Sequence, residues 1–264
     1  MRIYKVLTIA GSDSGGGAGI QADLKTMTAF GVYGLSVITS VTAQNTLGVQ
    51  GIHDLPPEFV ELQLDSVLSD IGAHAAKTGM VSNSEIIAAV AKKLRQYKVP
   101  NLVVDPVMMA KSGDPLLRDD AREALIEEIL PLAQLVTPNI PEAEALSGLR
   151  IESLNDMREA ARKIRELGPQ AVLVKGGHRQ EDAVDVLWDG EVFREFPAER
   201  LDQKHTHGTG CTYSAAIASC LARGLPLPRA IAIAKKYITQ AIREGLAVGK
   251  GYGPVNHLVP VDWS

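Results

Sequence analysis

The amino-acid sequence predicts an α/β fold, a three-layer αβα sandwich around a mostly parallel sheet. Short apolar runs rich in valine and isoleucine alternate with longer segments that have helical spacing. Strands that are apolar throughout are buried on both faces, which is typical of parallel sheets covered by helices. Polar or glycine-rich residues follow nearly every apolar run, and ligands of such sheets bind beyond the carboxyl ends of the strands.

In chain order, the apolar runs predict strands at residues 6–10, 35–41, 102–105, 135–137 and 171–175. Helical spacing predicts helices at residues 20–30, 57–71, 85–97, 118–130, 154–167, 210–223 and 227–246. The dipeptide Asp189-Gly190 lies between two strand-like segments, 183–188 and 191–196, and predicts a two-residue type I′ hairpin. Since no linker or repeat divides the chain, we expect residues 1–264 to form one domain.

Composition and charge exclude several classes of protein. With 45% hydrophobic and 22% charged residues, a globular core is expected. A net charge of −4 gives no reason to expect nucleic acid or an anionic membrane as partner, and no apolar run approaches the ~18 residues of a membrane span. Cys211 and Cys220 point to opposite faces of one predicted helix. We therefore expect them not to pair, in a reducing, cytoplasmic setting.

The stretch GSDSGGGAGIQAD, residues 11–23, places five glycines between the first strand and the first helix. Backbone N–H groups without a neighbouring Cβ can approach an anionic ligand, and the helix that follows presents its positive end. The nucleotide fingerprints G-x-G-x-x-G and G-x-x-x-x-G-K-[ST] do not match this stretch. It predicts an anion-binding loop, with a flexible loop-to-helix turn as the alternative.

The stretch HTHGTGCT, residues 205–212, is the second candidate for binding an anion. Gly208 and Gly210 can direct several consecutive N–H groups toward one point, and Thr209 adds a hydroxyl. The alanine-rich helix that follows favours negative charge at its start. The alternative is an ordinary helix start in which glycine and threonine only cap the helix.

Carboxylate and amide side chains near the strand ends predict a site for hydrated Mg²⁺. In TPNIPEAEAL, Asn139 and Glu142 are three residues apart, and Pro141 suits the first turn of a helix. Mg²⁺ usually binds one or two carboxylates together with phosphate oxygens and water. Asp105 ends a buried strand, where it could bind the metal or cap the next turn. For Asn139 and Glu142, an ordinary acidic helix start is the alternative.

Lys175 ends another strand, in LVKGG, and from there it could reach phosphate oxygens. Gln44 and Asn45 in TAQN, with Lys77 and Met80 in KTGM, could line a pocket for a small molecule. The histidines of HTHGTGCT have no further ligand cluster that would make a zinc site. Two anion-binding loops, carboxylates at strand ends and a lysine together predict phosphoryl transfer from MgATP.

The chain also carries, in order, the stretches AGSDSGGGAGIQADLKT, TAQNT, KTGM, DPVM, TPNIPEAE, VKGGH and HGTGCT. Their combination resembles the hydroxymethylpyrimidine/phosphomethylpyrimidine kinases of thiamine biosynthesis, which belong to the ribokinase-like superfamily. The similarity covers nearly the whole chain. It implies a ribokinase-like sandwich that uses ATP and Mg²⁺ to phosphorylate a pyrimidine alcohol, and usually then its monophosphate. Since members are often dimers, it also implies a homodimer.

The resemblance implies roles for individual residues. Those around the pyrimidine ring would be Gln44, which would hydrogen-bond the ring, with Gly11, Asp23, Met80 and Val107. The metal would be bound by Asp105, Asn139 and Glu142. The ATP phosphates would be bound by Lys175, Gly208, Thr209 and Gly210, and catalysis would involve Lys175 and Cys211.

Cys211 stands where most ribokinase-like enzymes carry the catalytic aspartate. A helix N-terminus, a lysine and a metal could lower the pKa of its thiol toward neutrality, so that it acts as a base. A second hypothesis is that a neutral thiol makes room for a phosphate monoester in the second phosphorylation. That substrate is already anionic and needs no base, whereas a fixed aspartate would repel it. A small packing residue at a crowded helix start is the alternative.

Two other functions remain open at this point. A pyridoxal or pyridoxine kinase would act on a similar flat heteroaromatic ring with a hydroxymethyl group, and Gln44 could serve either ring. A non-catalytic pyrimidine sensor would not need the metal residues, the lysine and the anion loop together. The glycine-rich region and residues 111–115 are candidates for a lid, and the region after Gly249 is a candidate for contacts with adenine.

Overall fold

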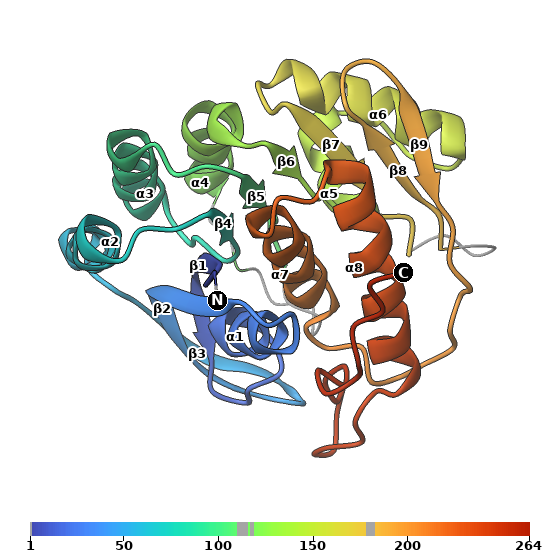
Figure 1. Ribbon diagram of the computed structural model, residues 1–264, viewed down its shortest axis with the longest axis horizontal. Coiled ribbons are helices and arrows are strands. Elements are labelled where there is room, and N and C mark those ends of the chain that lie inside the picture. Colours follow the sequence, from blue (N-terminus) through green and yellow to red (C-terminus); the bar gives the residue numbers. More distant parts are fainter. Residues whose placement is uncertain (1, 110–115, 117–118, 178–182) are drawn as a thin grey trace.

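A computed structural model describes residues 2–109, 116, 119–177 and 183–264 of the chain. In these residues, nine strands form one sheet in the order β3-β2-β1-β4-β5-β6-β7-β8-β9. Helices cover both faces of the sheet (Figure 1). The predicted αβα sandwich is therefore confirmed. Residues 111–115, one candidate for a lid, and His178 of the VKGGH stretch lie outside the described residues.

The strands are β1 (Lys5–Asp13), β2 (Tyr33–Asn45), β3 (Gly48–Asp54), β4 (Ala75–Thr78), β5 (Leu102–Val104), β6 (Leu135–Val136), β7 (Ala171–Val174), β8 (Asp185–Trp188) and β9 (Phe193–Phe196). Strands β1, β2 and β4 to β7 are parallel, whereas β3 at one edge and β8 and β9 at the other are antiparallel. The sequence did not predict β3 and β4. Strands β1 and β2 are longer than predicted, so Gly11 and Gln44 lie in strands and not in loops.

The hairpin at the β8–β9 edge differs from the predicted one. Trp188 pairs with Phe193, so four residues connect the two strands. The carboxylate of Asp189 accepts hydrogen bonds from the N–H groups of Glu191 and Val192, at 3.0 and 2.9 Å. Because this side chain closes the turn, the predicted two-residue type I′ turn is wrong.

Helices α1 (Gly19–Ala29), α7 (Thr209–Ala222) and α8 (Leu227–Arg243) share one hydrophobic core with one face of the sheet. The other face packs against α2 (Pro57–Asp70), α3 (Ser84–Tyr97), α4 (Asp119–Ala124), α5 (Ile140–Ser147) and α6 (Leu154–Glu166). A π-helical turn (Leu125–Ile129) and a 3-10 turn (Leu130–Leu132) follow α4. No helix of the described residues is long and apolar enough to cross a membrane.

Helix α7 is buried from Thr212 to Ala222, between the sheet and helices α1 and α8. Its alanine-rich sequence suits this place, because small side chains allow close packing on several sides at once. Cys211 and Cys220 are both free thiols, which confirms that they do not pair. The start of α7 is thereby held rigidly against the carboxyl ends of the central strands.

The strand order reverses at β1. Strand β2 lies on one side of β1 and β4 lies on the other (Figure 1). The strands that follow β1 in the chain are therefore added first at one side of β1 and then at the opposite side. In open parallel sheets, such a reversal opens a crevice beyond the carboxyl ends of the strands, where ligands bind. The ends of β1 and β4 therefore mark the expected place of the substrate.

Candidate active site at the carboxyl ends of the central strands

Asp105 and Lys175 form an ion pair directly beyond β5 and β7. The Nζ atom of Lys175 lies 2.8 Å from Oδ1 of Asp105, whose side chain is only 2% exposed. Thr137 follows β6 directly, and its hydroxyl donates to the same oxygen at 3.3 Å. Burial acts to lower the pKa of Lys175, but the charges of Asp105 and Glu142 outweigh it and raise that pKa. A permanent positive charge therefore lies at this edge of the sheet.

Asn139 and Glu142 cap the start of α5. The N–H of Glu142 donates to Oδ1 of Asn139 at 2.9 Å, and the N–H of Asn139 donates to Oε2 of Glu142 at 2.8 Å. This reciprocal capping box gives both side chains a structural role. Burial raises the pKa of Glu142 to about 7; the charge of Lys175 opposes this rise and that of Asp105 adds to it. A second acidic group thus lies beside the ion pair.

The chemistry of these donors fits a hydrated Mg²⁺. The carboxylates of Asp105 and Glu142 repel each other, and a cation between them would offset that repulsion. Mg²⁺ is commonly held by one or two carboxylates, with water and phosphate oxygens as its other ligands. In the described part of the chain, no three His, Cys, Asp or Glu side chains form a cluster that could hold a metal. Water and the phosphate oxygens of a nucleotide are the usual further ligands of such an ion.

The first turn of α7 has free backbone N–H groups. Gly208 is the N-cap, in the left-handed conformation with φ of 79°, and provides no side-chain cap. The hydroxyl of Thr209 donates to the carbonyl of Thr206 at 2.7 Å, so it serves the turn itself. Among the described residues, the N–H groups of Gly210 and Cys211 have no hydrogen-bond partner. These two groups are available to an anion.

The same turn faces the ion pair described above. A Cβ atom on Gly210 would lie 3.1 Å from Oδ2 of Asp105 and 3.5 Å from Nζ of Lys175. The absence of a side chain at this position leaves room between the helix start and the lysine. An anion held there would accept hydrogen bonds from the N–H groups of α7 and would be attracted by the positive charge of Lys175.

Cys211 is half-buried in this turn. Burial raises the pKa of its thiol to about 11; Lys77 opposes this rise, while Asp23 and Asp105 add to it. The N–H of Gly19, at the start of α1, donates toward the sulfur. In this arrangement burial outweighs the nearby positive charge, so the pKa of the thiol is raised and not lowered toward neutrality. A neutral thiol agrees with the geometry.

Asp23 and Lys77 form a second ion pair, and neither side chain has any exposed surface. Nζ of Lys77 lies 3.1 Å from Oδ2 of Asp23, and the hydroxyl of Thr8 donates to the same oxygen at 2.6 Å. Removing one partner of such a buried ion pair typically costs about 3–5 kcal/mol of stability, so the carboxylate of Asp23 and the amine of Lys77 depend on each other. The resemblance implies a place for Asp23 beside the pyrimidine ring; in the structure its carboxylate is buried and bonded to Lys77 and Thr8.

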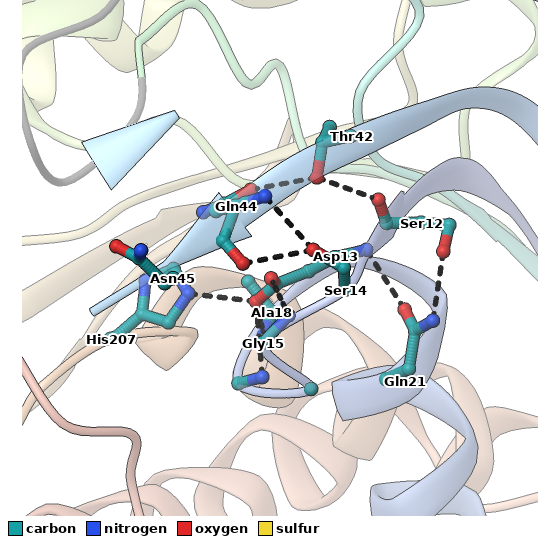
Figure 2. A network of polar contacts seen from close by, with 12 residues as sticks. Ser12, Asp13, Ser14, Gly15, Ala18, Gln21, Thr42, Gln44, Asn45 and His207 are labelled. Carbon is teal, nitrogen blue, oxygen red and sulfur yellow. Dashed lines mark hydrogen bonds and ion pairs between the residues drawn. The ribbon is translucent and has the colours of Figure 1, made fainter. Parts of the chain in front are cut away.

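The glycine-rich loop between β1 and α1 uses its N–H groups internally (Figure 2). The carboxylate of Asp13 accepts from the N–H groups of Gly15, Gly17 and Ala18 at 2.8, 3.0 and 2.8 Å. It also lies 2.9 Å from Nε2 of His207. Burial acts to raise the pKa of Asp13, but these bonds lower it, so the carboxylate is ionised. The prediction that this loop binds an anionic ligand is wrong for these three N–H groups.

Gly11, Met80 and Val107 lie at or just beyond the ends of three neighbouring strands. A Cβ atom on Gly11 would lie 3.0 Å from Sδ of Met80, so the two residues are in contact across the crevice between β1 and β4. Val107 is half-buried beyond β5, and its N–H donates to the carbonyl of Asp105 at 2.8 Å. These residues supply an apolar surface where the strand order reverses.

Gln44 is half-buried near the end of β2 (Figure 2). Its backbone N–H and carbonyl both bond the hydroxyl of Ser14, each at 2.8 Å. Its side-chain oxygen lies 3.2 Å from Oγ1 of Thr42. Among the described residues, the side-chain NH₂ group of Gln44 has no partner, which leaves it available to a ring nitrogen or oxygen.

Sequence reasoning missed the residues that hold these groups in place. The pairing of Asp13 with His207 joins positions 194 residues apart, and no local pattern indicates it. Asp185, at the start of β8, accepts from the N–H of Gly176 at 2.9 Å and from Lys235 at 2.7 Å, and so fixes the backbone next to Lys175. The sequence does contain one signal for this contact: Asp185 is a charged residue within the otherwise apolar run of residues 183–188.

The comparisons with known proteins agree with this site. A family model described as phosphomethylpyrimidine kinase matches residues 13–256. The chain is 48% identical to the hydroxymethylpyrimidine/phosphomethylpyrimidine kinase of Bacillus subtilis, over 97% of this chain and 96% of that protein. It is 56% identical to the thiamine biosynthesis bifunctional protein ThiED of Geobacter sulfurreducens, over 97% of this chain, which spans only 53% of that longer protein.

Among solved structures, the ADP complex of Bacillus subtilis pyridoxal kinase superimposes with a TM-score of 0.90 at 42% identity. The match covers 97% of this chain and 98% of that one. The fold is thus shared with an enzyme that acts on another vitamin. The family model covers nearly the whole chain, and with it the strand-end residues of the site other than Gly11. The chain belongs to the phosphomethylpyrimidine kinase family.

Proposed function

We propose that this chain phosphorylates 4-amino-5-hydroxymethyl-2-methylpyrimidine with ATP and then phosphorylates the monophosphate, as a kinase of thiamine biosynthesis. Family membership and the names of its relatives support this function. The structural observation that carries it is the free first turn of α7, which faces Lys175 beside a thiol. This arrangement can hold the phosphoryl group during its transfer. It also places an uncharged thiol where most ribokinase-like enzymes carry a catalytic aspartate.

The N–H groups of Gly210 and Cys211, together with Lys175, would hold the transferring phosphoryl group of ATP. Phosphoryl transfer needs little covalent chemistry from the protein, and positioning and charge stabilisation supply most of the rate. Donors fixed on a buried helix need no reorganisation during the reaction. A nucleotide complex of the similar pyridoxal kinase, which contains ADP, agrees with ATP as the phosphoryl donor.

Asp105 and Glu142 would hold Mg²⁺, with Asn139 fixing Glu142 through the capping box. When bound, the ion would offset the charge of the nucleotide phosphates. Asp105 lies 2.8 Å from Nζ of Lys175, so this carboxylate is held at the place where the cation would bind. Glu142, with a pKa of about 7, would become fully ionised as the cation approaches.

Cys211 would remain neutral in both reactions. The first substrate is an alcohol, whose proton leaves late in a loose transition state and passes to an oxygen of the transferred phosphoryl group, so the thiol need not accept it. The second substrate is a phosphate monoester, which is already anionic at neutral pH. Two unit charges about 4 Å apart repel by ~1 kcal/mol even in water, so an aspartate in this place would hinder the second substrate. The neutral thiol lets one site accept both.

Product masses test this function directly. Incubation with MgATP and the hydroxymethyl pyrimidine is expected to yield a product that has gained two phosphates, with the monophosphate as an intermediate. Pyridoxal is the second candidate substrate, because the similar solved structure is a pyridoxal kinase. A single phosphate on the pyrimidine, with pyridoxal phosphorylated faster, would contradict the proposal and favour a function in vitamin B6 salvage.

We further propose that the chain forms a homodimer through the β3 edge of the sheet. In the described part of the chain, β3 is the last strand at one edge of the sheet, and edge strands tend to pair with another chain. Three large apolar side chains of this hairpin are exposed: Val41, Leu47 and Ile52, at 41, 64 and 42%.

Light scattering is expected to give twice the chain mass of 28.2 kDa. Ile52→Lys should reduce it to one chain mass, whereas Val192→Lys, at the opposite edge, should not. A single-chain mass for the unmodified protein at about 10 μM would contradict a stable dimer.

A further inference from the structure

The contact between Asp13 and His207 joins two loops that are far apart in the sequence (Figure 2). Asp13 ends β1, and His207 lies just before α7. Their side chains meet at 2.9 Å and are only 3 and 13% exposed. The same carboxylate accepts from three N–H groups of the glycine-rich loop, residues 14–18. One side chain therefore connects that loop to residues 205–208.

The backbones of the two loops also fit closely. A Cβ atom on Gly208 would lie 1.8 Å from the carbonyl oxygen of Gly17, and one on Gly17 would lie 2.5 Å from Cδ2 of His207. No side chain larger than hydrogen can occupy either position without moving a loop. The backbone of His207 is fixed separately, since its N–H donates to Gly253 and its carbonyl accepts from Val255, both at 3.1 Å. His207 is therefore a fixed point to which the glycine-rich loop is bound.

Groups at the candidate site lie immediately after each loop. The N–H of Gly19, next to Ala18, donates toward the sulfur of Cys211. Gly208 begins the turn in which the N–H groups of Gly210 and Cys211 are free. A displacement of one loop relative to the other would move these N–H groups away from the transferring phosphoryl group. Errors of about 1 Å in such positions can cost on the order of 10²-fold in rate.

We propose that Asp13 and His207 are positioning residues, whose contact sets the glycine-rich loop against the first turn of α7 and thereby sustains phosphoryl transfer. The inference rests on the kinase function proposed above. It gives the glycine-rich loop a use other than binding phosphate: its N–H groups bind a carboxylate of the chain itself. Neither Asp13 nor His207 needs to touch the substrate.

His207→Ala is expected to lower kcat by about 10- to 100-fold, while the KM for the pyrimidine changes by less than about threefold. The N–H groups that would move act on charge in the transition state, whereas the residues around the ring remain in place. His207→Gln keeps an N–H donor and should recover most of this loss. In Asp13→Ala, the addition of His207→Ala should cost less than about a further twofold, because both changes remove the same contact.

His205→Ala is the matched control. His205 lies two residues away, is also half-buried, and its Nδ1 accepts from the N–H of Gly253 at 3.1 Å instead of contacting Asp13. Its kcat should change by less than about threefold. Melting curves and circular dichroism of every variant allow kcat to be expressed per folded molecule.

A kcat for His207→Ala within about twofold of the unmodified enzyme would overturn the inference, and so would independent, multiplicative losses in the double variant or no recovery in His207→Gln. An unmodified enzyme without kinase activity would instead contradict the proposed function. The two failures are therefore distinguishable.

Discussion

Lys175→Met is expected to lower kcat by about 10²- to 10³-fold, with little change in the KM for the pyrimidine. Lys175 both faces the first turn of α7 and pairs with Asp105, at 2.8 Å. Removal of one preorganised group that stabilises charge in the transition state typically has an effect of this size. Steady-state kinetics with saturating MgATP measures it. Lys175→Arg, which keeps the charge, should lose less.

Part of any loss in Lys175→Met could come from leaving Asp105 buried without its partner. Lys235→Met is the matched control, because Lys235 pairs with Asp185 at 2.7 Å and the two side chains are 12 and 2% exposed, against 14 and 2% for the first pair. Both variants should lose comparable stability in urea, but Lys235→Met should keep kcat within about tenfold. Equal losses of kcat in the two variants would show that the charge of Lys175 does not act on the phosphoryl group.

The fold was predictable where local patterns decide it. The predicted helices 57–71, 85–97 and 154–167 agree with α2, α3 and α6 to within one residue at each end. Strand β4 was missed, because its sequence AAKT has little β-branched character and contains a lysine. That lysine is tolerated in a buried strand only because Asp23, from α1, neutralises it. A partner 54 residues away cannot be read from a short window of sequence.

The candidate site was predictable in its location and less so in its contacts. The rule that ligands bind beyond strand ends identified Asp105, Lys175 and the start of α7, and the structure brings these together. The rule does not say which donors are already used. Asp13 takes the N–H groups of the glycine-rich loop, and burial sets the pKa of Cys211, so both depend on the assembled fold.

Cys211→Asp should impair the second phosphorylation more than the first. Burial raises the pKa of the thiol to about 11, so Cys211 adds no charge at neutral pH. An aspartate would place a negative charge beside the phosphate monoester, and a repulsion of ~1 kcal/mol or more corresponds to about a fivefold loss or more. The alcohol carries no such charge. Cys211→Ser, which is neutral and of similar size, should leave the ratio of the two rates within about twofold of the unmodified enzyme.

The central claim is that a neutral Cys211 allows one site to accept both substrates. The most direct test is to measure the ratio of the second phosphorylation rate to the first. Product masses would be followed over time with MgATP, starting once from the hydroxymethyl pyrimidine and once from its monophosphate, for the unmodified enzyme, Cys211→Ser and Cys211→Asp. We predict that only Cys211→Asp lowers the rate of the second phosphorylation relative to the first, by about fivefold or more. Equal losses in both steps would contradict the account.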